Sequence, residues 1–185
     1  MNGYQIKQAM DIIPETSNFG GCFYNKNIPF EFLRARECFF VVNTVTDLRK
    51  MGHWILFYIK NCELYFFDSF GLHPREYGWD IEEFFNSYPL RKTIVFENAV
   101  QNDFSFVCGG YVIIFSYLTC KDYSIRRIKS LLTRNTRKND SFIASYLYSL
   151  IGITISCNQM FCPNYIFFSN CKNSVNVKFY FKYTF

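Results

Sequence analysis

The sequence predicts one domain that combines α-helices with β-strands around an apolar central helix. The segment Gly109–Leu118 is apolar on every side, which is typical of a helix enclosed by the rest of a fold. Short hydrophobic runs elsewhere have the length and composition of buried strands; these are Cys38–Val42, Trp54–Ile59, Leu64–Phe67 and Thr93–Phe96. The chain has 185 residues and half of them are hydrophobic, which suits a single domain over residues 1–185 with a sizeable core.

The N-terminal elements follow from local patterns along the chain. Apolar residues at helical spacing predict a helix over Tyr4–Ile13, and Pro14 should stop it. Glycine, asparagine and proline gather in Phe19–Pro29, which favours an irregular loop. The polar residues Lys60–Glu63 separate two of the predicted strands and indicate a β-hairpin.

The later part of the chain is predicted to be mainly helical. Acidic and aromatic residues at helical spacing predict a helix over Trp79–Tyr88, with Asp80–Glu83 forming a capping box at its start. The segment Arg126–Lys138 has the pattern of a basic amphipathic helix. A further helix is predicted over Ser141–Ile151.

The eight cysteines raise the question of compartment. The sequence shows no secretory signal, and no apolar run approaches the roughly 20 residues that a membrane span needs. We therefore expect an intracellular protein with no membrane partner, in which the cysteines are free thiols. Near the C-terminus, Cys157, Cys162 and Cys171 lack a Cys-x-x-Cys pair and a nearby histidine, so no metal site is predicted.

The chain contains only two histidines, His53 and His73, so any histidine-assisted mechanism must use one of them. His53 lies at the start of a predicted strand, and Asp68 follows fifteen residues later at the end of the next strand. A hairpin would bring the Asp68 carboxylate beside the imidazole, where it would fix the tautomer and stabilise the imidazolium. The alternatives are a structural histidine and a strand-ending turn aspartate. His73 lies in a turn-like segment before Pro74.

Cys108 stands between a polar loop and the apolar helix. The positive end of a helix lowers the pKa of a thiol, and a nearby His53 would do the same and supply a proton to a leaving amine. Gly109 and Gly110 carry no side chain, so a peptide could approach the thiol closely. A cysteine before an apolar helix is usually a core residue. The combination of polar loop, Gly-Gly and helix distinguishes Cys108.

Gln101 lies seven residues before Cys108. Its side-chain amide could donate to the oxyanion that forms when a thiolate attacks a carbonyl, with the Cys108 backbone N–H as the second donor. A glutamine in a loop is weak evidence by itself. The ordered set of His53, Asp68, Gln101 and Cys108 is much stronger evidence for a cysteine protease.

These motifs resemble the adenovirus protease (adenain) family, including the related proteases of Polinton/Maverick elements and other large DNA viruses. Proteases that remove SUMO and similar modifiers are more distant relatives. The similarity covers roughly residues 19 to 120. It is carried by Gly52–Trp54, Phe67–Gly71, Gln101, Cys108–Gly109 and, further upstream, Phe19–Gly21, Pro29–Phe30 and Asn43–Thr44.

The resemblance implies an α+β fold in which a mixed β-sheet is flanked by helices and Cys108 opens the central helix. It implies Cys108 as nucleophile, His53 as general base and acid, Asp68 as third member and Gln101 as oxyanion donor. Trp54 would pack over the site. The implied activity is a cysteine endopeptidase that cuts viral capsid or core precursors at Gly-containing sites during virion maturation.

The implied setting is the host nucleus or cytoplasm and the virion, with the enzyme acting as a monomer. No cofactor is required for the chemistry, while activation by DNA or a viral peptide is left open. DNA would bind the basic segment Arg126–Lys138 through salt-sensitive phosphate contacts, although a solvated helix face is an equal alternative. Adenain has Glu at the position of Asp68 and a peptide-binding cysteine just before its oxyanion glutamine. Here the nearest upstream cysteine is Cys62, so that activation should not carry over unchanged.

Other functions remain open at this point. The same catalytic set could serve an isopeptidase that acts on ubiquitin-like tails ending in Gly-Gly, or an acyltransferase that forms an acyl-enzyme. The chain could also be a catalytically silent nucleic-acid-binding or structural virion protein. The complete set of His53, Asp68, Gln101 and Cys108 argues against a silent protein.

Overall fold

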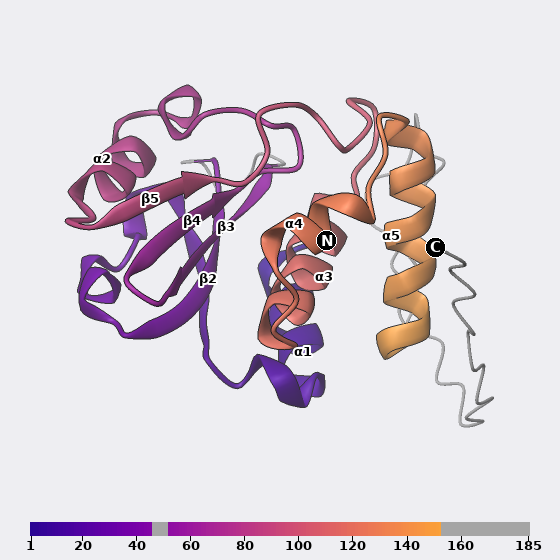
Figure 1. Ribbon diagram of the computed structural model, residues 1–185, viewed down its shortest axis with the longest axis horizontal. Helices are drawn as coiled ribbons and strands as arrows, with labels where there is room; N and C mark the ends of the chain where they lie inside the picture. The colour runs from indigo at the N-terminus through magenta and orange to yellow at the C-terminus, as the bar shows by residue number, and fades with distance from the viewer. Residues whose placement is uncertain (46–51, 153–185) are drawn as a thin grey trace.

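The computed structural model describes residues 1–45 and 52–152, in which helices surround one β-sheet (Figure 1). The strands are β1 (Phe19–Tyr24), β2 (Glu37–Asn43), β3 (Trp54–Lys60), β4 (Glu63–Phe67) and β5 (Arg91–Ile94). The α-helices are α1 (Gly3–Ile12), α2 (Trp79–Ser87), α3 (Cys108–Cys120), α4 (Ile125–Ser130) and α5 (Thr136–Ile151). Short 3₁₀ helices are η1 (Pro14–Thr16), η2 (Asn25–Asn27), η3 (Phe30–Arg34) and η4 (Pro74–Tyr77).

The sheet is mixed and has the order β1-β2-β3-β4-β5. Strand β3 is antiparallel to its neighbours β2 and β4, whereas β1 is parallel to β2 and β5 is parallel to β4. The predicted hairpin between β3 and β4 is confirmed. It turns at Asn61 and Cys62, whose φ angles of 52° and 62° suit a tight two-residue turn. The register pairs Leu56 with Phe67, so the start of β3 lies beside the end of β4.

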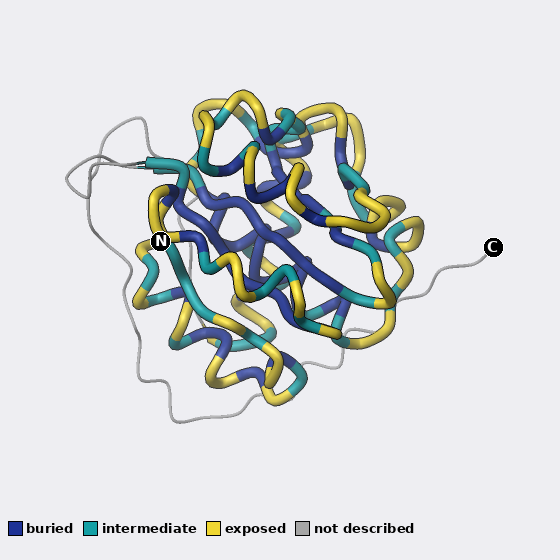
Figure 2. The backbone as a smooth tube through the Cα atoms, turned by 90° about the vertical axis from the view of Figure 1, so that its left-hand side faces the viewer, coloured by how far each residue is buried: buried dark blue, intermediate teal, exposed yellow. Residues whose placement is uncertain are grey.

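Both faces of the sheet are covered. Helices α1, α3, α4 and α5 lie on one side and α2 lies on the other (Figure 1). Because side chains alternate along a strand, Leu56 and Tyr58 join the first layer while Ile55 and Phe57 join the second. The central strands are therefore buried along their length, as Figure 2 shows. A mixed sheet flanked by helices, with Cys108 opening a buried helix, is the fold class that the sequence predicted.

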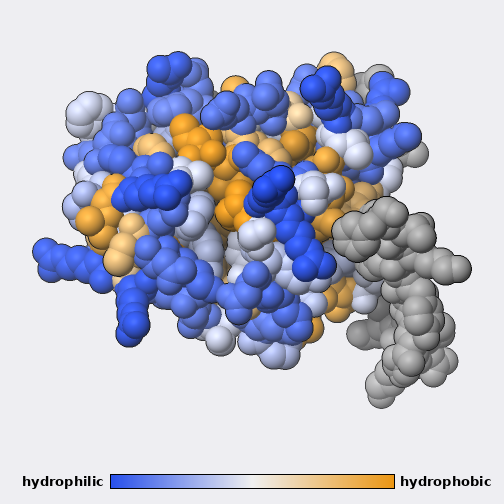
Figure 3. All heavy atoms as spheres, in the orientation of Figure 1, coloured by the Kyte–Doolittle hydropathy of each residue, from blue (hydrophilic) through white to orange (hydrophobic). Residues whose placement is uncertain are grey.

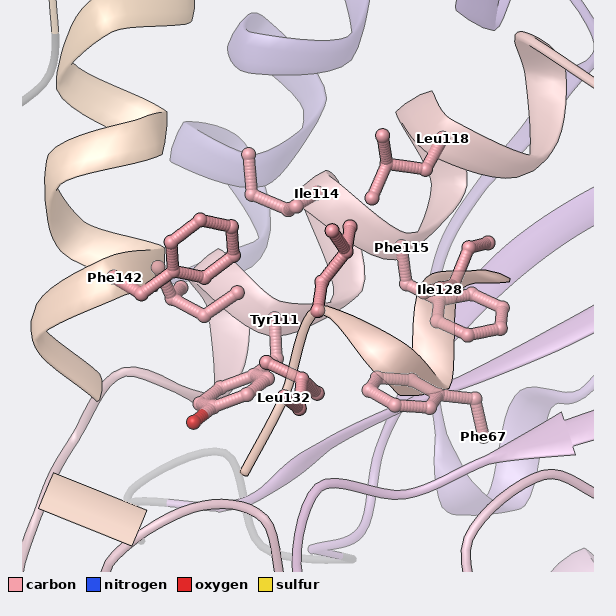
Figure 4. Close-up of a pocket in the computed structure, with 10 residues that line it drawn as sticks. Phe67, Tyr111, Ile114, Phe115, Leu118, Ile128, Leu132 and Phe142 are labelled. Carbon is pink, nitrogen blue, oxygen red and sulfur yellow. The ribbon is translucent and has the colours of Figure 1, made fainter. Parts of the chain in front are cut away.

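The apolar helix α3 occupies the centre of the first layer. It packs against the sheet, α1 and α5, and all of its residues from Cys108 to Ser116 are buried. Figure 4 shows the small apolar pocket that remains where α3, α4 and α5 meet. Leu132 and Phe142 line its outer part, and Phe115 and Phe67 line it toward the sheet. Among the described residues, no helix is long and apolar enough to cross a bilayer.

The segment predicted as a loop over Phe19–Pro29 begins with a strand instead. Strand β1 carries a register shift between Phe19 and Cys22, and Gly21 within it has φ of 127°. A side chain at Gly20 would collide with the Phe32 ring, since an added Cβ would lie 2.8 Å from Phe32 Cζ. The glycines therefore mark a bulge and a close approach within an edge strand, which local composition alone does not distinguish from a loop.

Two helix predictions were also wrong in detail. Asp80 does not cap α2, because Gly78 occupies the N-cap position without a side-chain hydrogen bond and Asp80 lies in the first turn. The basic segment Arg126–Lys138 is not one helix, because it divides into α4 and the start of α5. Asn135 caps α5 by accepting from the Lys138 N–H at 3.0 Å, and this alternative hydrogen bond ends the continuous helical pattern.

Candidate active site

His53 is held at the entrance to β3. Its backbone N–H donates to Thr44 Oγ1 at 3.2 Å, and its carbonyl accepts from the Thr44 N–H at 2.9 Å. Thr44 directly follows β2, so the antiparallel pairing of β2 with β3 continues as far as the histidine. The position of the imidazole is therefore determined by the sheet and not by a free loop.

Asp68 follows β4 and lies beside His53, as the hairpin predicted. Its Oδ1 is 2.5 Å from His53 Nε2 and also accepts from the Phe70 N–H at 3.1 Å. Its Oδ2 accepts from the Leu72 N–H at 2.7 Å and from the Tyr77 hydroxyl at 2.8 Å. The carboxylate is only 1% exposed, and four donors satisfy its lone pairs. This arrangement fixes the tautomer of the imidazole.

Two aromatic rings flank the imidazole. The Phe70 ring lies with its centroid 4.4 Å from that of His53, and the Tyr77 ring lies at 6.0 Å in a nearly parallel orientation. Both residues also donate to Asp68, one through its backbone and the other through its hydroxyl. Phe70 and Tyr77 therefore each bond to Asp68 and place a ring beside the His53 imidazole.

Cys108 and His53 are electrostatically coupled. His53 Nδ1 is buried without another hydrogen-bond partner among the described residues, so it is the nitrogen available to the Cys108 thiol. Burial opposes the charged imidazolium, but the hydrogen bonds to Asp68 and Cys108 outweigh it and raise the pKa of His53 to about 9. Burial likewise opposes the Cys108 thiolate, yet His53 and the Trp54 N–H lower the pKa of Cys108 below its usual value. This is the pattern of a thiolate–imidazolium pair.

The other described cysteines behave differently. Burial raises the pKa of Cys22 to about 12 and the pKa of Cys38 and Cys120 to about 11. All five cysteines in residues 1–45 and 52–152 are free thiols. Among those whose pKa is shifted, Cys108 is the one whose pKa falls, which makes it the best candidate for a nucleophile.

Gln101 is buried in the loop that leads to Cys108 and is 1% exposed. Its Oε1 accepts from the Ser69 hydroxyl at 2.6 Å, and its Nε2 donates to Ser105 O at 2.8 Å. Its backbone N–H donates to Ser69 O at 3.0 Å. Because Ser69 follows Asp68 directly, these bonds tie the Gln101 loop to the turn that carries the carboxylate. One of the two N–H bonds of the amide is used by Ser105, and the amide nitrogen has a second N–H to donate.

Trp54 and Gly109 are in contact with the segment that precedes α1. The Trp54 indole N–H donates to Met1 O at 2.9 Å. An added Cβ at Gly109 would lie 2.9 Å from Met1 Cβ. The absence of a side chain at Gly109 thus makes room for Met1. Gly110 is buried in the first turn of α3.

His73 lies outside this cluster. It forms the N-cap of η4, where its Nδ1 accepts from the Arg75 N–H at 3.3 Å, so the turn predicted there is present. No group of three or more metal-ligating side chains occurs among the described residues. The C-terminal cysteines Cys157, Cys162 and Cys171 lie outside the described residues.

Sequence reasoning did not identify the residues that hold the cluster in place. Ser69 and Phe70 stood within the Asp68 motif without a role, although a polar side chain next to a candidate carboxylate is a usable signal. Tyr77 comes from a 3₁₀ turn nine residues after Asp68, and no local pattern pointed to it. Asn139 and Asp140, which contact the Gln101 loop, are still more distant in sequence, 39 and 38 positions from the loop residues they bond.

The fold is of the adenain/SUMO-protease type, which confirms the predicted resemblance at the level of fold. No family model and no curated protein matches the sequence. Among solved structures, the chain is similar to ASFV pS273R protease, with a TM-score of 0.54 and 16% identity over 75% of this chain and 63% of that one. It thus spans less than two thirds of that protease. It is also similar to ChlaDub1 from Chlamydia trachomatis, with a TM-score of 0.48 and 13% identity over 80% of this chain and 76% of that one.

Proposed function

We propose that this protein is a cysteine endopeptidase with Cys108 as nucleophile, His53 as general base and acid, and Asp68 as the residue that orients the imidazole. The observation that carries the proposal is the placement of His53, with Nε2 bonded to Asp68 and Nδ1 available to a thiol of lowered pKa. The fold shared with a protease and the motifs shared with the adenain family support the same assignment.

The geometry supports acyl transfer in two stages. The Cys108 thiolate attacks the carbonyl carbon of the scissile peptide, and the carbonyl electrons move to oxygen. Gln101 Nε2 and the Cys108 N–H donate to this oxyanion, while His53 gives its proton to the departing amine. A water molecule, deprotonated by His53, then attacks the thioester and releases the acid. The C–S bond breaks, so the thiolate is restored beside the imidazolium that His53 became when it took the proton from water.

For the substrate, we infer viral capsid or core precursors that are cut at Gly-containing sites during virion maturation. The adenain-like motifs and the likeness to a viral protease fold favour this class. The test is co-expression with candidate precursors, with cut sites determined by mass spectrometry. We expect cleavage next to glycine that disappears in Cys108→Ala. Cleavage that persists in Cys108→Ala would contradict the assignment of the nucleophile.

An isopeptidase that acts on ubiquitin-like tails ending in Gly-Gly is the second candidate, because the same catalytic set and fold serve modifier proteases. A modifier carrying a C-terminal glycine vinyl sulfone separates the two. Labelling of Cys108 by this probe, together with failure to cut precursor peptides, would favour the isopeptidase. No labelling and efficient precursor cleavage are expected for the maturation protease.

A DNA partner is proposed from the surface of α4 and α5. Every cation of the segment predicted to bind DNA is exposed: Arg126, Arg127, Lys129, Arg134, Arg137 and Lys138. Figure 3 shows that strongly hydrophilic side chains project from the face of the molecule that includes α4. Binding that weakens steeply with salt and is reduced by Arg126→Gln with Arg127→Gln is expected. Binding that is absent at low salt would exclude DNA as an activator.

A further inference from the structure

The loop that carries Gln101 is tied to the start of α5 on both sides of the glutamine. On one side, Val100 O accepts from Asn139 Nδ2 at 2.8 Å. On the other, the Asn102 N–H donates to the Asp140 carboxylate, with distances of 3.3 Å to Oδ2 and 3.4 Å to Oδ1. Two consecutive residues of a helix that begins 35 residues after Gln101 therefore hold the backbone immediately before and after it.

Helix α3 contributes to the same contact. The Tyr111 hydroxyl lies 2.8 Å from Val100 O and 3.0 Å from Asp140 Oδ1, so it joins both anchoring points. Tyr111 belongs to the first turn of the helix that Cys108 opens. The Gln101 loop, α5 and the helix that Cys108 opens are thus connected by one hydrogen-bond network.

The anchoring residues are buried and held independently of the loop. Asn139 is 2% exposed and also bonds to Thr133, accepting from its N–H at 2.8 Å and donating to its carbonyl at 2.9 Å. Asp140 is 3% exposed. Burying a carboxylate carries a large desolvation cost, and packing α5 against α3 requires only apolar side chains. The carboxylate at this position therefore indicates a role beyond packing.

We propose that Asn139 and Asp140 are positioning residues that act through Gln101 to place its side-chain amide for the oxyanion. This inference rests on the proposed function. The physical reason is geometric, since a displacement of about 1 Å in a catalytic group can reduce a rate by about 100-fold. It assigns a catalytic task to α5, which lies beyond the part of the chain that resembles adenain.

The test is a double-mutant cycle on a peptide from a mapped cut site. Gln101→Ala is expected to lower kcat by about 100-fold, as loss of one oxyanion donor does. Asp140→Ala is expected to lower kcat about tenfold with little change in KM. The kcat of the double variant should be at most about twofold below that of Gln101→Ala, because the effects of residues that act through one another are not additive. Ser141→Ala, an exposed neighbour on α5, is the matched control and should match the wild type.

The rate at which iodoacetamide alkylates Cys108 distinguishes positioning from general damage. Asp140→Ala should leave this rate unchanged, because the His53–Cys108 pair does not depend on Gln101. If Asp140→Ala no longer melts cooperatively, Asp140→Asn takes its place in the cycle. If the wild type is active but the losses in kcat of Asp140→Ala and Gln101→Ala are fully additive in the double variant, this inference alone is overturned. The same holds if the alkylation rate of Cys108 falls together with kcat in Asp140→Ala. A wild type that hydrolyses no peptide and no modifier would overturn the proposed function and this inference with it.

Discussion

The hydroxyl of Tyr77 donates a hydrogen bond to Asp68 Oδ2 over 2.8 Å, and the ring of the same residue lies nearly parallel to the His53 imidazole. One side chain thus contacts both members of the pair that would activate the nucleophile. The bond leaves Oδ1 to His53 and the Phe70 N–H. Tyr77 therefore selects which carboxylate oxygen faces the imidazole.

Tyr77→Phe tests this role, because it removes the hydroxyl and keeps the ring. Hydrogen bonds to charged groups contribute about 1.5–3 kcal/mol, and part of that should appear as a loss of about 3- to 10-fold in kcat/KM. Tyr65→Phe is the matched control, since the Tyr65 hydroxyl also donates to a carboxylate at 2.8 Å, that of Glu63, away from the site. Equal kcat/KM values for the two variants, measured with the same peptide, would contradict the assignment.

The coupled pair of Cys108 and His53 predicts the pH dependence of activity. The pKa of His53 is raised to about 9, so the imidazolium is present below that pH and is lost as pH rises through it. The pKa of Cys108 is lowered, so its thiolate forms at a lower pH than the thiolate of an ordinary cysteine does. We expect kcat/KM to rise as the thiolate forms and to fall again near pH 9.

Asp68→Asn provides the control for the alkaline side of this profile. The hydrogen bond and charge of Asp68 help to raise the pKa of His53. Without them the imidazolium should be lost at lower pH, and the alkaline fall in kcat/KM should move in that direction. An alkaline limb that stays in place in Asp68→Asn would show that another group controls it.

Gly71 allows the Asp68 turn to pack against the chain that leads to Gln101. Its φ is 69°, and an added Cβ would lie 2.3 Å from the backbone carbon of Asn98. Gly152 has the same φ, but an added Cβ there would meet no atom of the described residues within 4 Å, so the variant reports the cost of the backbone conformation. Gly152→Ala should destabilise the fold by about 1–2 kcal/mol.

Gly71→Ala should lower the melting temperature further than Gly152→Ala and should also reduce activity, because the neighbouring N–H groups of Phe70 and Leu72 hold Asp68. Thermal melts and kcat/KM for the two variants provide the comparison. Similar melting temperatures would mean that the loop relaxes around the new methyl group.

Patterns within short segments were sufficient for much of this fold. The short continuous apolar runs of β2, β3 and β4 identify them as strands, and the hairpin between β3 and β4 places Asp68 beside His53 by register alone. The apolar character of α3 on all sides reflects its position between the sheet and other helices. In each of these features, the residues that determine the local structure lie close together in the sequence.

Features that depend on distant contacts could not be predicted in this way. The segment with Gly20 and Gly21 has the composition of a loop, because the Phe32 ring that requires a glycine at position 20 comes from a later segment. The anchoring of Val100 by Asn139 joins residues 39 positions apart. The contact of Met1 with Gly109 likewise joins residues far apart in the sequence.

Ser69 offers the most direct test of how Gln101 is oriented. Its hydroxyl donates to Gln101 Oε1 at 2.6 Å, which turns the amide nitrogen of Gln101 away from Ser69. In Ser69→Ala the buried oxygen loses its donor, and the amide can rotate so that its nitrogen no longer serves the oxyanion. We expect kcat to fall about tenfold with little change in KM, together with a loss of about 1–2 kcal/mol in the free energy of unfolding.

Ser116→Ala separates these two effects. Ser116 is equally buried, and its hydroxyl donates at 2.7 Å to Val112 O within α3, so its removal changes no contact of Gln101. Both variants should lose stability, whereas only Ser69→Ala should lose kcat. If kcat followed the free energy of unfolding in both variants, Ser69 would be a structural residue. A fall in kcat confined to Ser69→Ala would show that the oxyanion donor depends on which way its amide faces.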